Sequence, residues 1–320
     1  MITTVTVNAA IDKTYIVENF SLNGVFRVQR VMAQAGGKGL NVARVVKALG
    51  EEVVATGFLG GHNGRFIEES LAVEGIKGDF VHVVGESRIC LNILDPTGKS
   101  QTELLEPGPE VGLADREKLK DKVRTLARRS RVITMSGSLA RRLPPGFYAE
   151  LIAAVKQEGT RVILDTSGTA LKEGLTSRPF MVKPNLQEAG ALTGRHLEGE
   201  TARRDFVREL LATGVEVVAL SLGAEGALIG TGESLFQVIP PQVRAVNTVG
   251  CGDAFVAGFA VALARGEDVV AAARLATAAA AASAASLGTG QVKNVLVNEL
   301  LQMIIFQPVE VVKNKCGDAS

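Results

Sequence analysis

The residues with the clearest chemical potential lie in the stretch Thr248-Val249-Gly250-Cys251-Gly252-Asp253-Ala254-Phe255. Here two glycines flank a small residue, an acid follows, and an apolar run typical of a helix begins. Glycines allow a tight turn, and the unpaired N–H groups at a helix N-terminus bind anions. Asp253 would then lie where its carboxylate can accept a proton from a hydroxyl group. These features suit phosphoryl transfer to an alcohol, and a plain glycine-rich turn before a helix is the alternative.

A second glycine-rich stretch, Ala35-Gly36-Gly37-Lys38-Gly39-Leu40-Asn41-Val42-Ala43, also precedes an amphipathic helical pattern. It predicts either a loop that approaches a polyol closely or a plain tight turn in which Asn41 caps the helix. It is not a P-loop, because Gly39 stands where that motif requires Ser or Thr.

Two further motifs follow apolar, strand-like runs. In Lys183-Pro184-Asn185-Leu186-Gln187-Glu188, the acid and the asparagine are three residues apart and share one helix face. That face suits phosphates and a metal, or simple capping of the helix. Ser221-Leu222-Gly223-Ala224-Glu225-Gly226-Ala227 ends another strand, which is a common nucleotide position in α/β folds and also a common place for a hairpin turn.

The elements that carry these motifs are short β-branched runs alternating with helical periods. This alternation predicts an α/β fold, a doubly wound and mostly parallel sheet with helices on both faces. The expected strands are 3–7, 53–58, 79–84, 131–135, 161–165, 181–183, 215–221, 227–231 and 235–239. The expected helices are 39–49, 64–74, 116–128, 145–157 and 201–213, followed by a helical region to about 302, a last edge strand and a tail.

Two segments, 15–30 and 88–105, do not fit crossover helices. We expect them to form strands of a small β-sheet lid inserted into the main fold, with two long surface hairpins as the alternative. Residues 1–8, 32–86 and 107–320 would then form the main nucleotide- and substrate-binding domain. Residues 9–31 and 87–106 would form the lid.

Composition excludes several classes of protein. The 320 residues include 35 Lys and Arg against 34 Asp and Glu, so the chain lacks the basic charge of a nucleic-acid-binding protein. Its three cysteines do not suggest a disulfide framework, which favours a cytoplasmic location. No stretch of about 20 strongly apolar residues predicts a membrane span, and the N-terminus does not resemble a signal peptide.

Taken together, in this order and spacing, the four motifs resemble those of the ribokinase-like (PfkB) carbohydrate kinase family, over the chain to about Val312. Within the family, three stretches resemble the phosphosugar branch, which comprises 1-phosphofructokinases, tagatose-6-phosphate kinases and the minor 6-phosphofructokinase. They are Val7-Asn8-Ala9-Ala10-Ile11-Asp12, Gly85-Glu86-Ser87-Arg88 and Ser136-Gly137-Ser138-Leu139. The stretch 102–111 leans towards the tagatose-6-phosphate kinases.

The resemblance implies a role for individual residues. Asp253 would be the catalytic base, and the anion hole for the transferred phosphoryl group would be formed by Gly250, Cys251 and Gly252. The sugar phosphate would be held by Asp12, Gly37, Lys38, Asn41 and Ser138, with Arg88 and Arg27 on its phosphate. The ATP-binding residues would be Lys183, Asn185, Ser221, Gly223 and Gly226, and Glu188 would act on Mg²⁺ through water.

The implied reaction is ATP- and Mg²⁺-dependent phosphorylation of a ketohexose phosphate to a 1,6-bisphosphate. Fructose 1-phosphate is the leading substrate and tagatose 6-phosphate the alternative. A more remote alternative is a non-catalytic regulator that binds a sugar phosphate or a nucleotide, although such a protein does not need the base. The branch also implies a homodimer formed through the lid.

The chain departs from the family pattern at several positions. Cys251 stands where relatives usually have Ala, and a thiol at a helix N-terminus tends to have a lowered pKa. We therefore expect Cys251 to be sensitive to alkylation and protected by ATP. The insertion Ala140-Arg141-Arg142-Leu143 precedes a proline pair, and its two arginines are either solvated or in contact with a phosphate.

Overall fold

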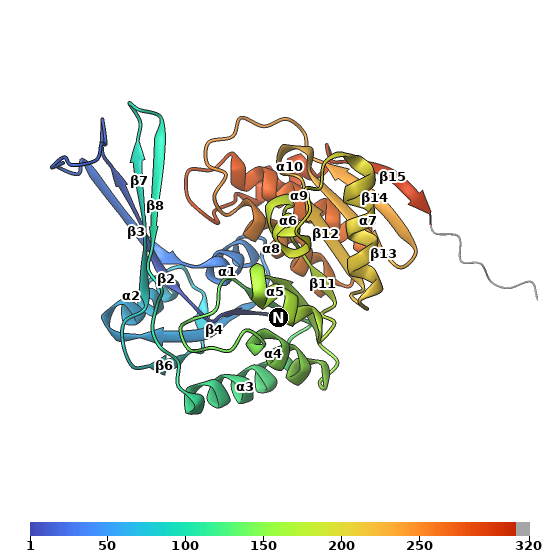
Figure 1. The fold of residues 1–320 in the computed structure, drawn as a ribbon, viewed down its shortest axis with the longest axis horizontal. Coiled ribbons are helices and arrows are strands. Elements are labelled where there is room, and N and C mark those ends of the chain that lie inside the picture. The colour runs from blue at the N-terminus through green and yellow to red at the C-terminus, as the bar shows by residue number, and fades with distance from the viewer. Residues whose placement is uncertain (312–320) are drawn as a thin grey trace, which may run out of the picture.

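The computed structural model describes residues 1–311, in which strands and helices alternate along most of the chain (Figure 1). The strands of the main sheet are β1 (Ile2–Thr6), β4 (Val53–Gly60), β5 (Lys77–Gly78), β6 (Val81–Val83), β9 (Val132–Ser136), β10 (Arg161–Asp165), β11 (Met181–Val182), β12 (Val217–Ser221), β13 (Ala227–Thr231), β14 (Ser234–Ile239) and β15 (Ile305–Val311). They form one eleven-stranded sheet in the order β15-β14-β13-β12-β11-β10-β9-β1-β4-β5, with β6 paired to β4.

The sheet is parallel from β12 through β11, β10, β9 and β1 to β4, and antiparallel from β12 to β15. The helices are α1 (Lys38–Ala48), α2 (Gly61–Val73), α3 (Leu113–Ala127), α4 (Phe147–Lys156), α5 (Gly168–Leu175), α6 (Leu186–Thr193), α7 (Gly199–Ala212), α8 (Cys251–Arg265), α9 (Val269–Ala284) and α10 (Asn294–Leu301). The expected doubly wound α/β fold is confirmed.

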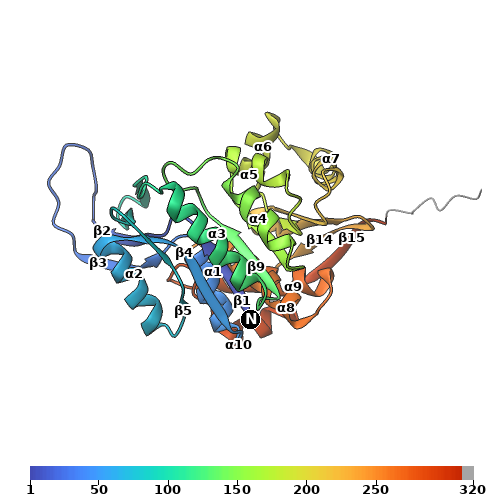
Figure 2. The same ribbon diagram turned by 90° about the horizontal axis from the view of Figure 1, so that it is seen from below.

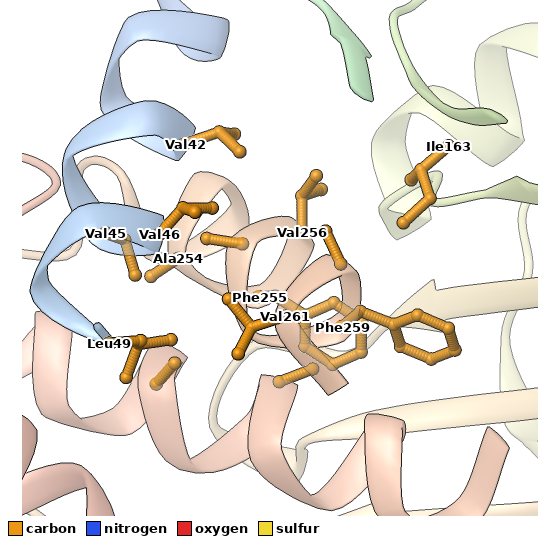
Figure 3. Close-up of a cluster of buried hydrophobic side chains, with 14 of the residues drawn as sticks. Val42, Val45, Val46, Leu49, Ile163, Ala254, Phe255, Val256, Phe259 and Val261 are labelled. Atoms are coloured by element: carbon orange, nitrogen blue, oxygen red, sulfur yellow. The ribbon is translucent and has the colours of Figure 1, made fainter. Parts of the chain in front are cut away.

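Each face of the sheet has its own apolar core. One core joins α1, α8, α9 and α10 to the sheet, and the other joins α3, α4, α5 and α7 to the opposite face (Figure 2). Ile163 of β10 belongs to the first core together with side chains of α1 and α8 (Figure 3). Because parallel strands end at one edge of the sheet, the loops after β1, β9, β10 and β12 open on the same side.

The α8–α9 pair is packed very closely. A Cβ atom at Gly258 of α8 would lie 2.8 Å from Ala276 Cα of α9, so the helices approach at a position that only glycine allows. Both helices are rich in alanine, and yet no helix within residues 1–311 is long and apolar enough to cross a membrane.

A small second sheet stands beside the main one, as expected, and we call it the lid (Figure 1). Its strands, in the order β3-β2-β7-β8, are β2 (Ala10–Ile16), β3 (Arg30–Gly36), β7 (Arg88–Asp95) and β8 (Ser100–Leu105). Most of the expected strand segment 15–30 is instead the connection between β2 and β3, and β3 continues to Gly36, past the expected lid boundary at residue 31.

Asp95 stabilises this connection. Its carboxylate, 3% exposed, accepts hydrogen bonds from the backbone N–H groups of Asn19, Phe20, Thr97 and Gly98, at 3.0 Å each. One side chain therefore fixes both the start of the β2–β3 connection and the β7–β8 turn.

Most of the expected elements agree with the structure within a few residues. The exceptions are the segment 15–30, which is mostly a connection, and 79–84, of which only Val81–Val83 is strand. The sequence pattern did not indicate α5 or β5. The expected last edge strand is β15. The expected tail lies outside the described residues.

Candidate active site

The acid Asp253 lies in the first turn of α8, 5% exposed. The helix begins after Gly250, whose φ of 87° lies in the left-handed region. A Cβ atom there would lie 2.9 Å from the backbone nitrogen of Gly290, so the turn requires glycine. Asp253 thus lies beside the first-turn N–H groups of α8, which is the position that the sequence motif predicts.

Asn41 of α1 holds the carboxylate of Asp253. The Asn41 side-chain amide donates from Nδ2 to Asp253 Oδ2 at 2.9 Å, and both residues are buried. Burial, aided by the negative charge of Asp165, raises the pKa of Asp253 to about 7, and Lys38, Asn41 and Lys183 oppose the rise. A carboxyl group with a pKa near neutrality is matched to general base catalysis.

A cluster of charges lies at the carboxyl ends of β10 and β11, in which Asp165 and Lys183 are buried and Lys38 is partly exposed. Asp165 Oδ1 lies 3.3 Å from Lys38 Nζ and 3.5 Å from Lys183 Nζ. The charge of Asp165 raises the pKa of Lys38 above its ordinary value. A Cβ atom at Gly252 would lie 3.3 Å from Lys183 Nζ, so this ammonium group lies beside the first turn of α8. Cations that lie beside helix N–H groups are the combination that suits an anion.

Sequence reasoning missed Asp165. Its signal was an acid that ends an almost entirely apolar strand, which places the carboxylate at the edge where the other motifs gather. The residue is 1% exposed, and its Oδ2 atom has no hydrogen-bond partner among the described residues.

Glu188 forms a reciprocal capping box with Asn185. Glu188 Oε2 accepts from the Asn185 N–H at 3.0 Å, and Asn185 Oδ1 accepts from the Glu188 N–H at 2.8 Å, which is the capping alternative that the sequence left open. The other carboxylate oxygen of Glu188 lies 3.7 Å from Lys38 Nζ. The acid is therefore fixed at the edge of the charged cluster.

The carboxylates of this cluster suit a magnesium ion that is held mainly by water and phosphate. Within residues 1–311, no group of three or more His, Cys, Asp and Glu could hold a metal ion by itself. Magnesium usually keeps several waters and binds through one or two carboxylates and the substrate phosphates. Glu188 and the Oδ2 atom of Asp165, which has no hydrogen-bond partner among the described residues, fit that mode of binding. In this mode, water and phosphate supply most of the ligands.

The Lys183–Glu188 motif and the Ser221–Ala227 motif meet at the carboxyl end of β12. Ser221 ends β12, and its backbone N–H donates to Pro184 O at 3.0 Å, so the Lys183–Glu188 and Ser221–Ala227 motifs lie side by side. Gly226 has a φ of 88°, and a Cβ atom there would lie 2.0 Å from Val238 O. The short 3-10 turn Gly223–Glu225 lies between Ser221 and Gly226.

The lid contributes Asp12 of β2 and Arg88 of β7 to the opposite side of the site. The Asp12 carboxylate packs against Gly36, where a Cβ atom would lie 2.1 Å from Asp12 Cγ. Burial raises the pKa of Asp12 to about 6, and Arg88 and Arg44 oppose this. Arg88 donates from Nε to Asn8 O at 3.2 Å.

Two predicted substrate residues complete this side. Ser138 accepts a hydrogen bond from Asn8 Nδ2 at 3.3 Å, and Gly37, with a φ of 101°, is the N-cap of α1. Arg27 is not brought to the others: it is exposed in the connection between β2 and β3, without a hydrogen bond or ion pair to any described residue.

The structure also shows the surroundings of the two departures from the family pattern, the arginine pair Arg141 and Arg142 and the thiol of Cys251. Arg141 and Arg142 both pair with Glu110, at 2.7 and 2.9 Å, which joins the segment after β8 to the loop after β9.

Burial raises the pKa of the Cys251 thiol, which is the reverse of the expected direction. Desolvation outweighs the helix N-terminus here, so the basis for predicting a reactive thiol is wrong.

Comparison with known proteins gives a consistent picture. The family model for pfkB family carbohydrate kinases matches residues 3–294. A tagatose-6-phosphate kinase of Staphylococcus epidermidis is 38% identical over 266 residues, covering 82% of this chain and 85% of that relative. The tetrameric inhibited form of phosphofructokinase-2 from Escherichia coli has a TM-score of 0.88 and 28% identity, covering 94% of this chain and 98% of that one. A possible 1-phosphofructokinase of Thermotoga maritima has a TM-score of 0.88 and 25% identity, covering 97% and 100%.

Proposed function

This chain belongs to the pfkB family of carbohydrate kinases, and from that premise we propose that it transfers the γ-phosphoryl group of ATP to a ketohexose phosphate to form a 1,6-bisphosphate. As a sugar-phosphate kinase, it is a phosphotransferase with an alcohol acceptor. A reaction between two phosphorylated metabolites would take place in the cytoplasm.

The observation that carries the proposal is the buried pair of Asp253 and Asn41 at the N-terminus of α8. Asp253 would accept the proton of the sugar's acceptor hydroxyl group. The oxygen of that hydroxyl group would at the same time form a bond to the γ-phosphorus. The bond from that phosphorus to the bridging oxygen breaks, and ADP leaves with the electron pair. The first-turn N–H groups of α8 and the Lys183 ammonium would stabilise the charge on the transferred group.

The remaining residues would orient the two substrates. Lys183, Asn185, Ser221, Gly223 and Gly226 would line the ATP phosphates, and Glu188 would hold Mg²⁺ through water. The bound cation would supply charge neutralisation at the phosphates. Asp12, Gly37, Lys38, Asn41 and Ser138 would hold the sugar, and Arg88 would bind the phosphate that it already carries.

We place tagatose 6-phosphate first among the substrates to test. The tagatose-6-phosphate kinase of S. epidermidis is 38% identical to this chain, whereas the possible 1-phosphofructokinase of T. maritima is 25% identical. This reverses the order that the sequence motifs suggested. Fructose 1-phosphate stays the second candidate, supported by the structural likeness to the T. maritima protein.

A coupled assay of ADP release separates these possibilities. Tagatose 6-phosphate, fructose 1-phosphate, fructose 6-phosphate, fructose and ribose are compared by kcat/KM with ATP and Mg²⁺. We expect one phosphorylated ketohexose to be preferred. Turnover of unphosphorylated sugars alone would overturn the phosphosugar assignment. If none is turned over and ATP still binds, the chain is a regulator rather than a kinase.

We also propose that the lid forms a homodimer contact. Its outer strands, β3 and β8, carry apolar side chains that expose between 40% (Met32) and 64% (Leu105) of their surface, with Val31 and Leu104 between these values. The related E. coli enzyme has a tetrameric form. Sedimentation velocity of Leu104→Lys/Leu105→Lys should show a monomer, whereas Val73→Lys, at an even more exposed apolar position on α2, should not change the mass. A monomeric wild-type chain would contradict the proposal.

A further inference from the structure

The hydrogen bond that holds the base is itself supported by a second set of contacts. Asn41 Oδ1 accepts a hydrogen bond from Arg44 Nη1 at 3.0 Å. Arg44 pairs with Glu74 through two contacts, from Nε to Oε2 at 2.7 Å and from Nη2 to Oε1 at 3.1 Å. A continuous polar chain therefore runs from Glu74, the C-cap residue of α2, through α1 to Asp253.

The chemistry of the Asn41 side-chain amide gives this series of hydrogen bonds its importance. An asparagine amide has a donor end and an acceptor end of almost the same shape, and rotation by half a turn exchanges them. If Asn41 turned, its oxygen would face the carboxylate of Asp253 and repel it. A guanidinium group only donates hydrogen bonds and stays charged, so Arg44 can face only the oxygen of Asn41.

We propose that Arg44, held by Glu74, is a positioning residue that fixes the Asn41 amide with its donor end towards Asp253. This inference rests on the proposed function, in which Asp253 is the base. Arg44 would touch neither substrate nor ATP, and would act through Asn41.

The placement of Arg44 supports this role. The side chain is only 8% exposed, so an unpaired charge there would be very costly. Every donor atom of its guanidinium group has a partner, since Nη2 also donates to Ala35 O at 2.8 Å. Ala35 belongs to lid strand β3, so the same group also ties the end of the lid to the base.

The expected consequence has a definite sign. The charged groups that face Asp253 are Asp165 from β10, Lys38 from α1 and Lys183 after β11. Removing Arg44 leaves them in place, but it frees the Asn41 amide to turn. Loss of the donated hydrogen bond would raise the pKa of Asp253 further, because Asn41 now lowers it. Less base is then ionised at neutral pH, and activity recovers as the pH rises.

The test compares Arg44→Met with Arg265→Met across pH. Arg265 is a matched control, since it also donates to a glutamate, Glu51, and to a backbone oxygen, Leu49 O, at the opposite end of α8. We expect Arg44→Met to move the acid limb of the kcat profile up by about one pH unit, with activity largely recovered at high pH. Arg265→Met should leave the shape of the profile unchanged.

Two milder variants keep the test decisive if Arg44→Met does not fold. Arg44→Lys retains a cation that only donates, and should restore part of the profile. Glu74→Gln should move the acid limb of the kcat profile to higher pH, by less than Arg44→Met does. The inference is overturned if the foldable variants lose activity equally at every pH, or lose none. If the wild-type chain lacks kinase activity, the proposed function fails instead, and the two failures are thereby distinguished.

Discussion

The two sides of the candidate site are built in different ways. On one side, Asp253 and Asn41 lie on helices α8 and α1, inside the core of an eleven-stranded sheet. On the other side, Asp12 and Arg88 lie on a four-stranded lid whose outer strands are exposed. The groups that we propose to move a proton are thus held by core packing, and those that we propose to select the substrate lie on a smaller element. Substitutions should therefore lower kcat on the first side and raise KM on the second.

The sharpest test on the core side is Asp253→Asn. We expect kcat to fall by about 10²–10⁴-fold, because the amide cannot accept the proton, while ATP binding persists. Steady-state assay and calorimetric titration with ATP check this. Asp115→Asn is the matched control, since Asp115 also lies in a helix first turn, that of α3. Near-normal turnover of Asp253→Asn would remove Asp253 as the base.

On the lid side, the largest expected effect is that of Arg88→Ala. A charge-assisted hydrogen bond contributes about 1.5–3 kcal/mol, so the KM for the sugar phosphate should rise about 10- to 100-fold with little change in kcat. Arg141→Ala should have almost no effect, because Arg141 is paired with Glu110. An equal loss for fructose and for its phosphate would show that Arg88 does not read the phosphate.

The pH dependence of kcat sharpens the comparison. Asp253 must be ionised to act, and its pKa is raised to about 7, so activity should be present above that value and lost as the pH falls through it. Below the pKa, kcat should fall about tenfold per pH unit. A rate that stays flat between pH 8 and pH 5 in a buffer series would contradict the assignment.

The smallest expected effect concerns the lid turn. Asp95→Asn places an amide N–H where backbone N–H groups now donate to the carboxylate, so the β2–β3 connection should loosen. Hydrogen exchange should rise in residues 17–29, and KM should rise only a few-fold with kcat unchanged. An effect on kcat larger than that on KM would break the division between the two sides.

Local sequence patterns predicted the parts of the site that depend on neighbours in the chain. The strand Arg161–Asp165, the turn before α8 and the helix start at Asn185 were all visible, because each depends on residues a few positions apart. The roles expected of the site residues remain predictions.

Contacts across the sheet were not visible from the sequence. Asp165 meets Lys38, 127 positions away, only because α1 packs against β1, which lies two strands from β10 in the sheet. Nothing in the local sequence indicates the pairing of Arg44, since its partner Glu74 lies at the end of another helix. The pKa of the Cys251 thiol was misjudged for the same reason, because burial depends on the whole fold.

The close approach of α8 and α9 limits how this enzyme can be altered. At Gly258, even one added carbon atom would strike the backbone of the neighbouring helix, and residues 253–264 of α8 are all buried. A mutant library spread over the whole chain would therefore lose most of its α8 members to misfolding. Engineers who want a new sugar specificity should place their diversity in the lid strands, where exposed positions accept new side chains and the base stays where the core holds it.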